Sequence, residues 1–309
     1  MQSTRAFLER LGLPSGDLHQ MPDSPKRFPD GAQYRVEIPS VEGPGALAAV
    51  LEEGQARGVR IHRVSQGSGV MLLTDGELRE MAQLGAAAQI EVSLFVGPRA
   101  AWETGAQILS PAGRNLGARH RGMEQLVHAI EDVKRACSAG MRGVLVADEG
   151  LLWVLDEMKQ AGELPANLVI KVSVQMGAAN PASILLQERL GAGTYNVPTD
   201  LDLAKLAAIR AAVDLPIDLY VEVPDNFGGF VRHYEIADIV RVVSPVYLKF
   251  GLRNAPDVYP SGTHLEQTVI ALSRERVRRA EIGLSHLRRY YPEALTSELG
   301  AEGLAVPEV

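Results

Sequence analysis

The sequence predicts an α/β fold, a (β/α)8 TIM barrel with an N-terminal extension and a long C-terminal helix. Two observations carry this prediction: eight strand-like segments alternate with helical segments, and the alternation covers about 250 residues, the size at which such a barrel closes. A third observation disfavours an open doubly wound sheet, because no G-x-G-x-x-G motif follows the first strand. The predicted strands cover residues 33–40, 59–65, 90–96, 142–148, 168–174, 193–198, 217–223 and 245–251.

Helix-start signals lie between these strands. Pro44 occupies a first helical position, Asn180 is followed by Pro181, and the pattern Thr74-x-x-Glu77 is typical of a capping box. A second such pattern is Thr199-x-x-Asp202. The last helix runs over about 265–291, and we expect its arginine-rich stretch RERVRR (274–279) to be a solvated face. The predicted organisation is a leader over 1–32, the barrel over 33–297 and a flexible tail over 298–309.

Composition limits the classes of function. The chain has 309 residues, 46% of them hydrophobic, and a net charge of −7, which disfavours a nucleic-acid partner. Its apolar runs are far shorter than the roughly 20 residues that span a bilayer, so we expect no membrane partner and a cytoplasmic location. Cys137 is the single cysteine, which excludes an iron–sulfur cluster held by the cysteines of one chain. The long final helix leads us to expect a homo-oligomer.

The strand at 168–174 alternates apolar residues with Lys171 and Ser173. In a barrel, one set of alternate side chains faces the helices and the other faces the lumen. The apolar set faces the helices, so the lumen is predicted to be polar, which departs from the branched apolar layers of most barrels. The predicted lumenal set is Arg35, Glu37, Arg60, His62, Glu91, Ser93, Lys171, Ser173, Gln175, Tyr220, Glu222, Tyr247 and Lys249, with Asp148 at the end of the fourth strand and Asn196 within the sixth.

Two interpretations of this polar set compete. It forms an internal lattice of salt bridges, or it lines a pocket and acts on a small-molecule substrate. We favour the second, with Lys171, Lys249, Glu222 and Glu37 as catalytic residues, because a lysine among apolar neighbours is a candidate Schiff-base nucleophile or general base. The predicted activity is that of a lyase, aldolase or isomerase on a small anionic, carbonyl-containing metabolite.

Further polar residues follow the predicted strands and are candidates for substrate binding. The segment 97–122 is the longest insertion and carries an excess of positive charge, with Arg114, Arg119, His120 and Arg121 against Glu103. This segment is predicted to be either a lid over an anionic substrate or a solvated excursion. The predicted substrate-binding residues are His62, Gln66, Glu91, Arg99, Asp148, Gln175, Asn196 and Arg253.

Two alternative functions stay open. The oxygen donors Glu37, Glu91, Asp148 and Glu222, together with His62, are of the type that holds Mg²⁺ or Mn²⁺ for enolate stabilisation. Neighbouring lysines disfavour that alternative, because their positive charge competes with the metal cation for the carboxylates. The other alternative is a barrel that binds a ligand without converting it.

Two segments resemble a known family. Residues 108–113 (ILSPAG) are similar to the "LLAPAG" signature of the bacterial peptidase U32-like barrel proteins, and 139–146 (AGMRGVLV) are similar to the "AGADAVYVG" continuation of that signature. The resemblance covers about 40 residues. It implies a TIM barrel and, as an alternative function, a U32-like peptidase. The family's cysteine-bearing signature is absent, so the resemblance assigns no catalytic residue here.

Overall fold

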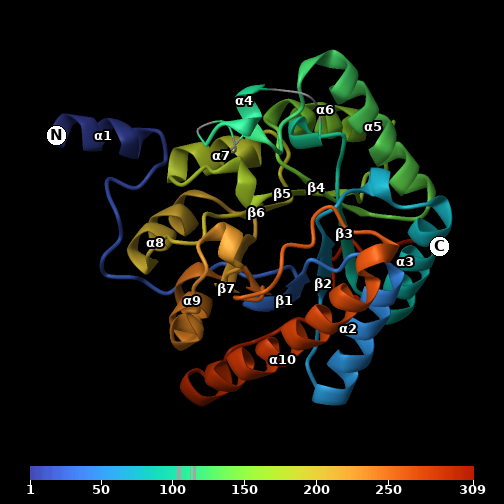
Figure 1. The fold of residues 1–309 in the computed structure, drawn as a ribbon. Helices are drawn as coiled ribbons and strands as arrows, with labels where there is room; N and C mark the ends of the chain where they lie inside the picture. The colour runs from blue at the N-terminus through green and yellow to red at the C-terminus, as the bar shows by residue number, and fades with distance from the viewer. Residues whose placement is uncertain (103–105, 112, 114–115) are drawn as a thin grey trace.

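The computed structural model describes residues 1–102, 106–111, 113 and 116–309. Eight parallel strands close into a barrel in sequence order, with β1 paired to β8, and helices surround it (Figure 1). The predicted TIM barrel is therefore confirmed. The strands are β1 (Tyr34–Pro39), β2 (Arg63–Gln66), β3 (Glu91–Phe95), β4 (Gly143–Val146), β5 (Val169–Val172), β6 (Thr194–Asn196), β7 (Ile217–Glu222) and β8 (Val246–Phe250).

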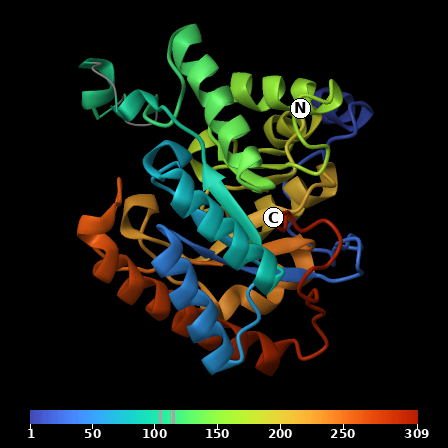
Figure 2. The same ribbon diagram turned by 90° about the vertical axis from the view of Figure 1, so that its right-hand side faces the viewer.

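The helices follow the strands in the order that right-handed crossovers require. The long α10 packs lengthwise against α2, and the two lie side by side in both ribbon views (Figures 1 and 2). The helices are α1 (Gln2–Arg10), α2 (Pro44–Arg57), α3 (Asp75–Ala88), α4 (Ala106–Leu109), α5 (Gly122–Ser138), α6 (Glu149–Gln160), α7 (Pro181–Arg189), α8 (Leu203–Ala212), α9 (Ile236–Val243) and α10 (Glu266–Tyr290).

The main apolar core lies between the barrel wall and the helices. Val36, Val64 and Val92, on β1 to β3, are completely buried or nearly so, and they pack against inward-facing residues of the helices such as Leu47. This is the alternation that the sequence predicts. Because most of the apolar side chains on the strands face outward, mainly polar ones are left to fill the barrel's interior.

The predicted parity is wrong at two places. β2 begins at Arg63, so Arg63 and Ser65 face the lumen in place of Arg60 and His62, which precede the strand. On β7, a bulge shifts the register between Tyr220 and Glu222, so that Glu222 pairs with the outward-facing Phe250 of β8. A bulge re-aims the side chains that follow it. Glu222 therefore points out of the lumen.

Helix starts mostly agree with the sequence signals. The capping box of Thr74 and Glu77 is formed at α3, and the Asn180 side chain accepts a hydrogen bond from the Ser183 N–H at α7. The second predicted box is wrong, because Asp202 itself caps α8. Thr199 instead donates its hydroxyl hydrogen to the carbonyl of Phe227 at 2.8 Å.

Both chain ends contribute to the bottom of the barrel, where the strands begin. Phe28 packs edge-on against Tyr247, and the Arg35 guanidinium lies over the Phe28 ring. The segment predicted as a flexible tail is in contact with the barrel: the Glu302 carbonyl accepts a hydrogen bond from Arg35, and Glu308 pairs with Arg142 at 2.8 Å. These contacts close the lower end of the barrel.

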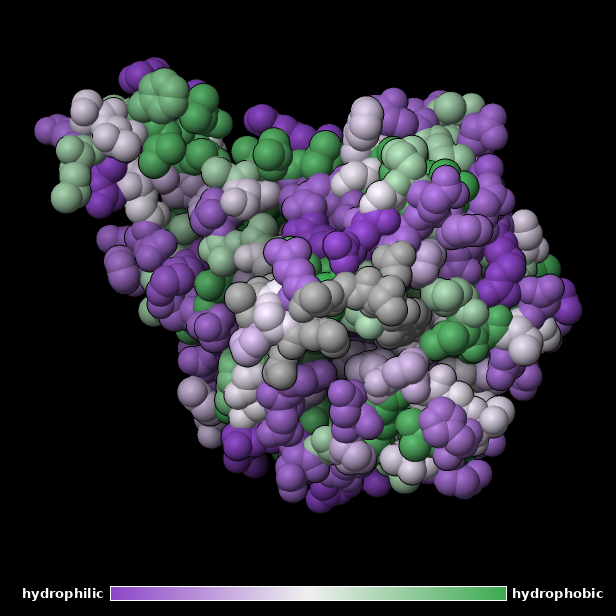
Figure 3. Space-filling model, turned by 45° about the horizontal axis from the view of Figure 1, so that its top comes forward, coloured by the Kyte–Doolittle hydropathy of each residue, from purple (hydrophilic) through white to green (hydrophobic). Residues whose placement is uncertain are grey.

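The surface is mostly polar on the face shown in Figure 3, with apolar side chains gathered on the part that projects at upper left. The element that projects on this side in Figure 1 is α1, which buries none of its residues and leaves Phe7 52% exposed. None of the described helices combines the length and the apolar character that crossing a bilayer requires.

Candidate active site

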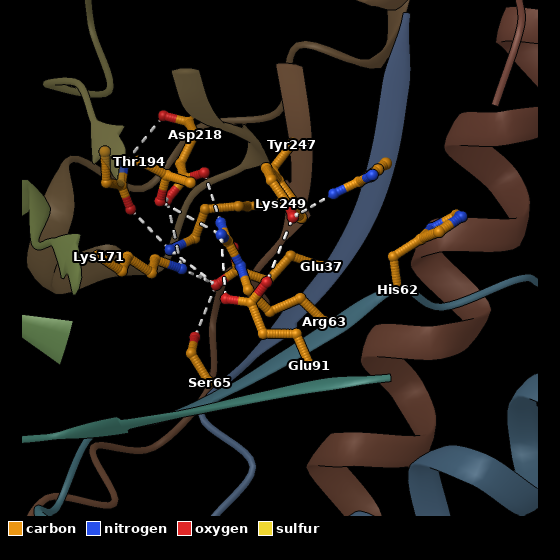
Figure 4. Close-up of polar contacts among 12 residues, drawn as sticks. Glu37, His62, Arg63, Ser65, Glu91, Lys171, Thr194, Asp218, Tyr247 and Lys249 are labelled. Atoms are coloured by element: carbon orange, nitrogen blue, oxygen red, sulfur yellow. Dashed lines mark hydrogen bonds and ion pairs between the residues drawn. The ribbon is translucent and has the colours of Figure 1, made fainter. Parts of the chain in front are cut away.

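Charged side chains from six strands meet in the middle of the lumen. Glu37 accepts hydrogen bonds from Arg63 at 2.5 and 2.8 Å, and Lys171 and Lys249 both bind its other carboxylate oxygen, Lys249 at 3.1 Å. Asp218 pairs with Arg63 and lies 3.4 Å from the Lys171 ammonium. Glu91 lies 3.5 Å from Arg63 (Figure 4). We call these residues the ion cluster: Glu37, Arg63, Glu91, Lys171, Asp218 and Lys249.

Strand register explains why the cluster forms. Glu37 lies beside Arg63 on one neighbouring strand and beside Lys249 on the other. Arg63 is in turn the register partner of Glu91. Opposite charges thus sit directly across from one another around the barrel, which is the arrangement that stabilises cross-strand pairs.

Burial and charge act against each other on the ionisation of the cluster. Burial alone would raise the pKa of Glu37, but Arg63, Lys171 and Lys249 outweigh burial and hold that pKa well below its ordinary value. Burial, reinforced by Arg63, lowers the pKa of Lys171 to about 7. Burial raises the pKa of Glu91, and the attraction of Arg63 offsets only part of that rise. Glu37 is therefore the anionic centre of the cluster.

Most of the ion cluster is sealed from solvent. The side chains of Glu37, Arg63, Glu91, Lys171 and Asp218 are all 0% exposed. Below them, the Tyr247 ring stacks under the Arg63 guanidinium at 3.5 Å. The lattice interpretation thus fits Lys171, which is enclosed by its ion partners and is not among the residues that line the pocket at the carboxyl ends of the strands.

A pocket of about 120 Å³ opens above the cluster at the carboxyl ends of the strands, where barrel active sites lie. Five of the predicted site residues line it: Lys249, Gln66, Arg99, Gln175 and Asn196. We call this the mouth pocket; its other lining residues are Pro39, Ser40, Ser65, Gly67, Phe95, Leu145, Ser173, Val174, Tyr220, Asn226, Phe227 and Tyr259.

Lys249 connects the ion cluster to the mouth pocket. Its ammonium donates to the Asn196 side-chain oxygen at 2.6 Å and lies 4.5 Å from the centre of the Tyr220 ring. Asn196 is held in turn by bonds from its amide to the carbonyls of Val197 and Asp218, both at 3.2 Å. Lys249 is thus fixed by three kinds of partner, a carboxylate, an amide and an aromatic face, at the floor of a pocket.

Arg99 forms part of the pocket wall and of its loops. It donates to the carbonyls of Gly67 and Ser68 at 2.7 and 2.5 Å, and it stacks on Phe95. Burial lowers the pKa of Arg99 to about 10, so it stays a cation at neutral pH. Arg99 thus brings the long segment 97–122 to the wall of the pocket. Arg119 pairs with Glu149 and Arg121 is exposed, while Arg114 and Glu103 lie outside the described residues.

Four predicted site residues lie elsewhere. His62 is at the bottom of the barrel, where Nδ1 accepts the Val36 N–H and Nε2 donates to the Ser297 carbonyl; Figure 4 shows it apart from the cluster. Burial lowers its pKa to about 4, so it is neutral. Asp148 caps α6, Glu222 points out of the lumen, and Arg253 follows β8 with an exposed side chain.

The outward turn of Glu222 gives it a different set of partners. Its carboxylate accepts the Arg253 N–H at 3.0 Å and lies 3.4 Å from Arg279 of α10 and 3.6 Å from His233. Burial raises the pKa of Glu222, which the Arg253 N–H and Arg279 partly offset. The Arg253 side chain is 55% exposed and pairs with Asp225 at 3.8 Å. Neither side chain lines the mouth pocket.

The predicted metal-binding set is not brought together. Glu37 and Glu91 are in the ion cluster, whereas His62, Asp148 and Glu222 are at three other places. Within the part of the chain that the structure describes, no three histidine, cysteine, aspartate or glutamate residues are grouped so as to hold a metal ion. Among the described residues, the five predicted metal ligands thus do not form a common site.

Several important residues were missing from the predicted site. Asp218 has the same parity as Tyr220, so the alternation on β7 was sufficient to place it in the lumen. Arg63 was missed because the predicted second strand begins too early, at residue 59. Tyr259 belongs to the loop after β8, and its sequence context carries no signal for the pocket that it lines.

Comparisons with known proteins support the fold. The model of peptidase family U32 matches residues 115–223, which include the resembling segment 139–146 but not 108–113. Among solved structures, a protein assigned as a fructose-1,6-biphosphate aldolase from Coccidioides immitis is 14% identical, with a TM-score of 0.51, and the match covers 83% of this chain and 92% of that one. A Rubisco-like protein from Rhodopseudomonas palustris is 14% identical, with a TM-score of 0.50, over 90% of this chain and 71% of that one.

The U32 family is also represented among these structures. The U32 peptidase Mk0906 is 20% identical, with a TM-score of 0.42, over 64% of this chain and 73% of that one. No curated protein matches the sequence. The chain is thus a TIM barrel with a weak, partial similarity to peptidase family U32.

Proposed function

We propose that the protein is an enzyme of the lyase or isomerase type that acts on a small anionic, carbonyl-containing metabolite, with Lys249 as the reacting residue. The observation that carries the proposal is the position of the Lys249 amine, at the floor of the mouth pocket, bonded to Asn196 and Glu37 and next to Tyr220. An amine at the floor of a pocket can reach a substrate carbonyl, whereas the amine of Lys171 is sealed.

The chemistry that this arrangement supports is formation of a Schiff base. The Lys249 ammonium releases a proton to solvent in the mouth pocket, and the neutral amine adds to the carbonyl carbon to give a carbinolamine. Protonation of the carbinolamine hydroxyl then releases water and leaves the protonated imine. The protonated imine then accepts the electron pair released when an adjacent C–C or C–H bond breaks. Hydrolysis of the imine returns the free amine and the product.

Two neighbours have defined roles in this proposal. Burial raises the pKa of the Tyr220 hydroxyl, so it keeps its proton at neutral pH and can donate it to the departing carbinolamine oxygen. No described residue hydrogen-bonds that hydroxyl, which leaves it available to a substrate. Arg99, on the pocket wall, supplies positive charge for an anionic group.

Borohydride trapping tests the proposal directly. The protein is incubated with a panel of 2-oxo acids and sodium borohydride, and the modified lysine is mapped by mass spectrometry. We expect an adduct on Lys249 that is lost in Lys249→Met and kept in Lys134→Met, which removes an exposed lysine as a matched control. Adducts confined to other lysines, or none at all, would remove the Schiff-base mechanism.

The same panel of 2-oxo acids distinguishes an enzyme from a barrel that binds a ligand without converting it. A compound that binds in the mouth pocket but is recovered unchanged would make the protein a ligand-binding barrel. The expectations of a cytoplasmic homo-oligomer without nucleic-acid or membrane partners are part of the proposal as well. Sedimentation of the purified chain measures the oligomeric state.

A further inference from the structure

Arg276 differs from the other arginines of α10. The expectation of a solvated face holds for Arg274 and Arg278, whose side chains are 41% and 50% exposed and pair with glutamates. It is wrong for Arg276, which lies on the buried side of the helix between Ser273 and Ala280 and is 4% exposed. An arginine on the buried side of a helix needs a partner for its charge.

The partners of Arg276 are few. Its Nη1 donates to the Ser40 carbonyl at 3.3 Å, and its Nε has no hydrogen-bond partner among the described residues. No carboxylate of the described chain lies within ion-pair distance of it; Glu42 interacts with it only over a longer range. Burial accordingly lowers the pKa of Arg276. A buried cation with so little compensation is costly unless a ligand completes it.

The side chain faces a cavity of about 260 Å³. The walls of this cavity are largely apolar and come from the loops after β7 and β8, including Phe227, Leu252 and Val258. Two carboxylates also line it, but each is engaged with the loop backbone: Asp225 accepts the Asn254 N–H and Asp257 accepts the Tyr259 N–H. We call this space the Arg276 cavity.

The Arg276 cavity is a neighbour of the mouth pocket and is distinct from it. The two share the wall residues Ser40, Tyr220, Asn226, Phe227 and Tyr259. The Tyr259 hydroxyl donates to the Ser40 hydroxyl, and this bond ties the loop after β8 to the end of β1 between the two spaces. Lys249 and Arg99 line only the mouth pocket, and Arg276 lines only its neighbour.

We infer that the Arg276 cavity is a second anion-binding site, which takes a small carboxylate with an apolar body. The guanidinium offers charged N–H donors that a carboxylate accepts. The apolar walls match a ring or branched chain better than they match a bare ion. This inference does not depend on the chemistry proposed for Lys249, because it concerns a different cavity and a different cation.

The test compares benzoate with benzamide, which has the same ring and size but no charge. Binding to the full chain is measured by calorimetry, and the Arg Nε–H signals are followed by NMR. We expect benzoate to bind, benzamide and inorganic phosphate to bind at least about tenfold more weakly, and an Arg Nε–H signal assigned to Arg276 to shift. Arg276→Met should weaken benzoate binding at least about tenfold, and Arg278→Met, on the same helix, should not.

Two further measurements distinguish the Arg276 cavity from the mouth pocket and ligand binding from a purely structural role of Arg276. Lys249→Met should keep the benzoate affinity, because Lys249 lines only the mouth pocket. The ligand-free Arg276→Met protein should unfold at the same temperature as the wild type or higher, because it loses a poorly compensated buried charge. The inference is overturned if benzoate does not bind, if benzamide binds equally well, if affinity depends on Lys249 instead, or if Arg276→Met is clearly less stable.

Discussion

Replacing Lys171 by methionine tests whether the ion cluster is a structural element. Methionine keeps the length of the side chain and removes its charge. With every group counted as ionised, the carboxylates of Glu37, Glu91 and Asp218 balance the cations Arg63, Lys171 and Lys249, and the variant has one cation fewer than the wild type.

The magnitude follows from burial. Lys171 and both of its carboxylate partners are 0% exposed, so water cannot replace the lost partner. Removing one member of such a buried pair typically costs about 3–5 kcal/mol. An exposed pair gives the contrast: Lys205 is 46% exposed and pairs with Asp202, and solvent screens this pair, so removing it should have little effect on stability.

Urea unfolding followed by circular dichroism measures both free energies. We expect Lys171→Met to lose about 3–5 kcal/mol and Lys205→Met to unfold close to the wild type. Adding Glu37→Gln to Lys171→Met should recover part of the loss, since the double variant has no excess charge. A Lys171→Met protein that is as stable as the wild type but no longer turns over substrate would refute the reasoning and return Lys171 to the reaction.

Three more predictions follow from individual residues. The pKa of His62 is lowered to about 4 by burial, against 6.5 when unfolded, so below about pH 6.5 the unfolded state binds the proton more tightly and stability falls as the pH drops towards about 4. Between these two pH values, the shift in the pKa of His62 changes the free energy of unfolding by about 3 kcal/mol. Urea unfolding at pH 6.5 and at about pH 4 should show this loss in the wild type and not in His62→Gln. Tyr220→Phe keeps the ring beside Lys249 but removes the hydroxyl, and turnover of a substrate found in the trapping panel should fall about 10²–10⁴-fold; a wild-type rate would contradict the proton-donor role. Glu222→Gln should leave the Lys249 adduct unchanged in mass spectrometry, because this carboxylate faces α10; a lost adduct would place it in the reaction.

The candidate site was partly predictable. Lys249, Asn196 and Gln66 were predicted because an alternating strand or a strand end places them at the mouth, and this needs only strand identity and direction. Lys171 and Glu37 were also correctly placed in the lumen, but depth along the barrel separates a sealed ion pair from a pocket floor. That depth is set by the stagger between neighbouring strands, which the strands' own sequences do not show.

Other residues were misplaced for local reasons. The β7 bulge turns Glu222 outward, although the preceding alternation gives no sign of it. His62 lies at the bottom of the barrel, just before β2, and its partner there is the Ser297 carbonyl, which is far away in the sequence. Arg276 looks like one more surface arginine, because helical spacing alone does not show which turn of a long helix passes behind a loop.

The sequence by itself determined the barrel, its eight strands, their order and the polar nature of its interior, because alternation and helix boundaries are local properties of the chain. The tertiary structure decided which of the interior charges neutralise one another and which line a cavity. Electrostatic pairing depends on distances of a few ångströms between segments far apart in the chain, and those distances are fixed only when strand register, the β7 bulge and the loops at the mouth are all in place.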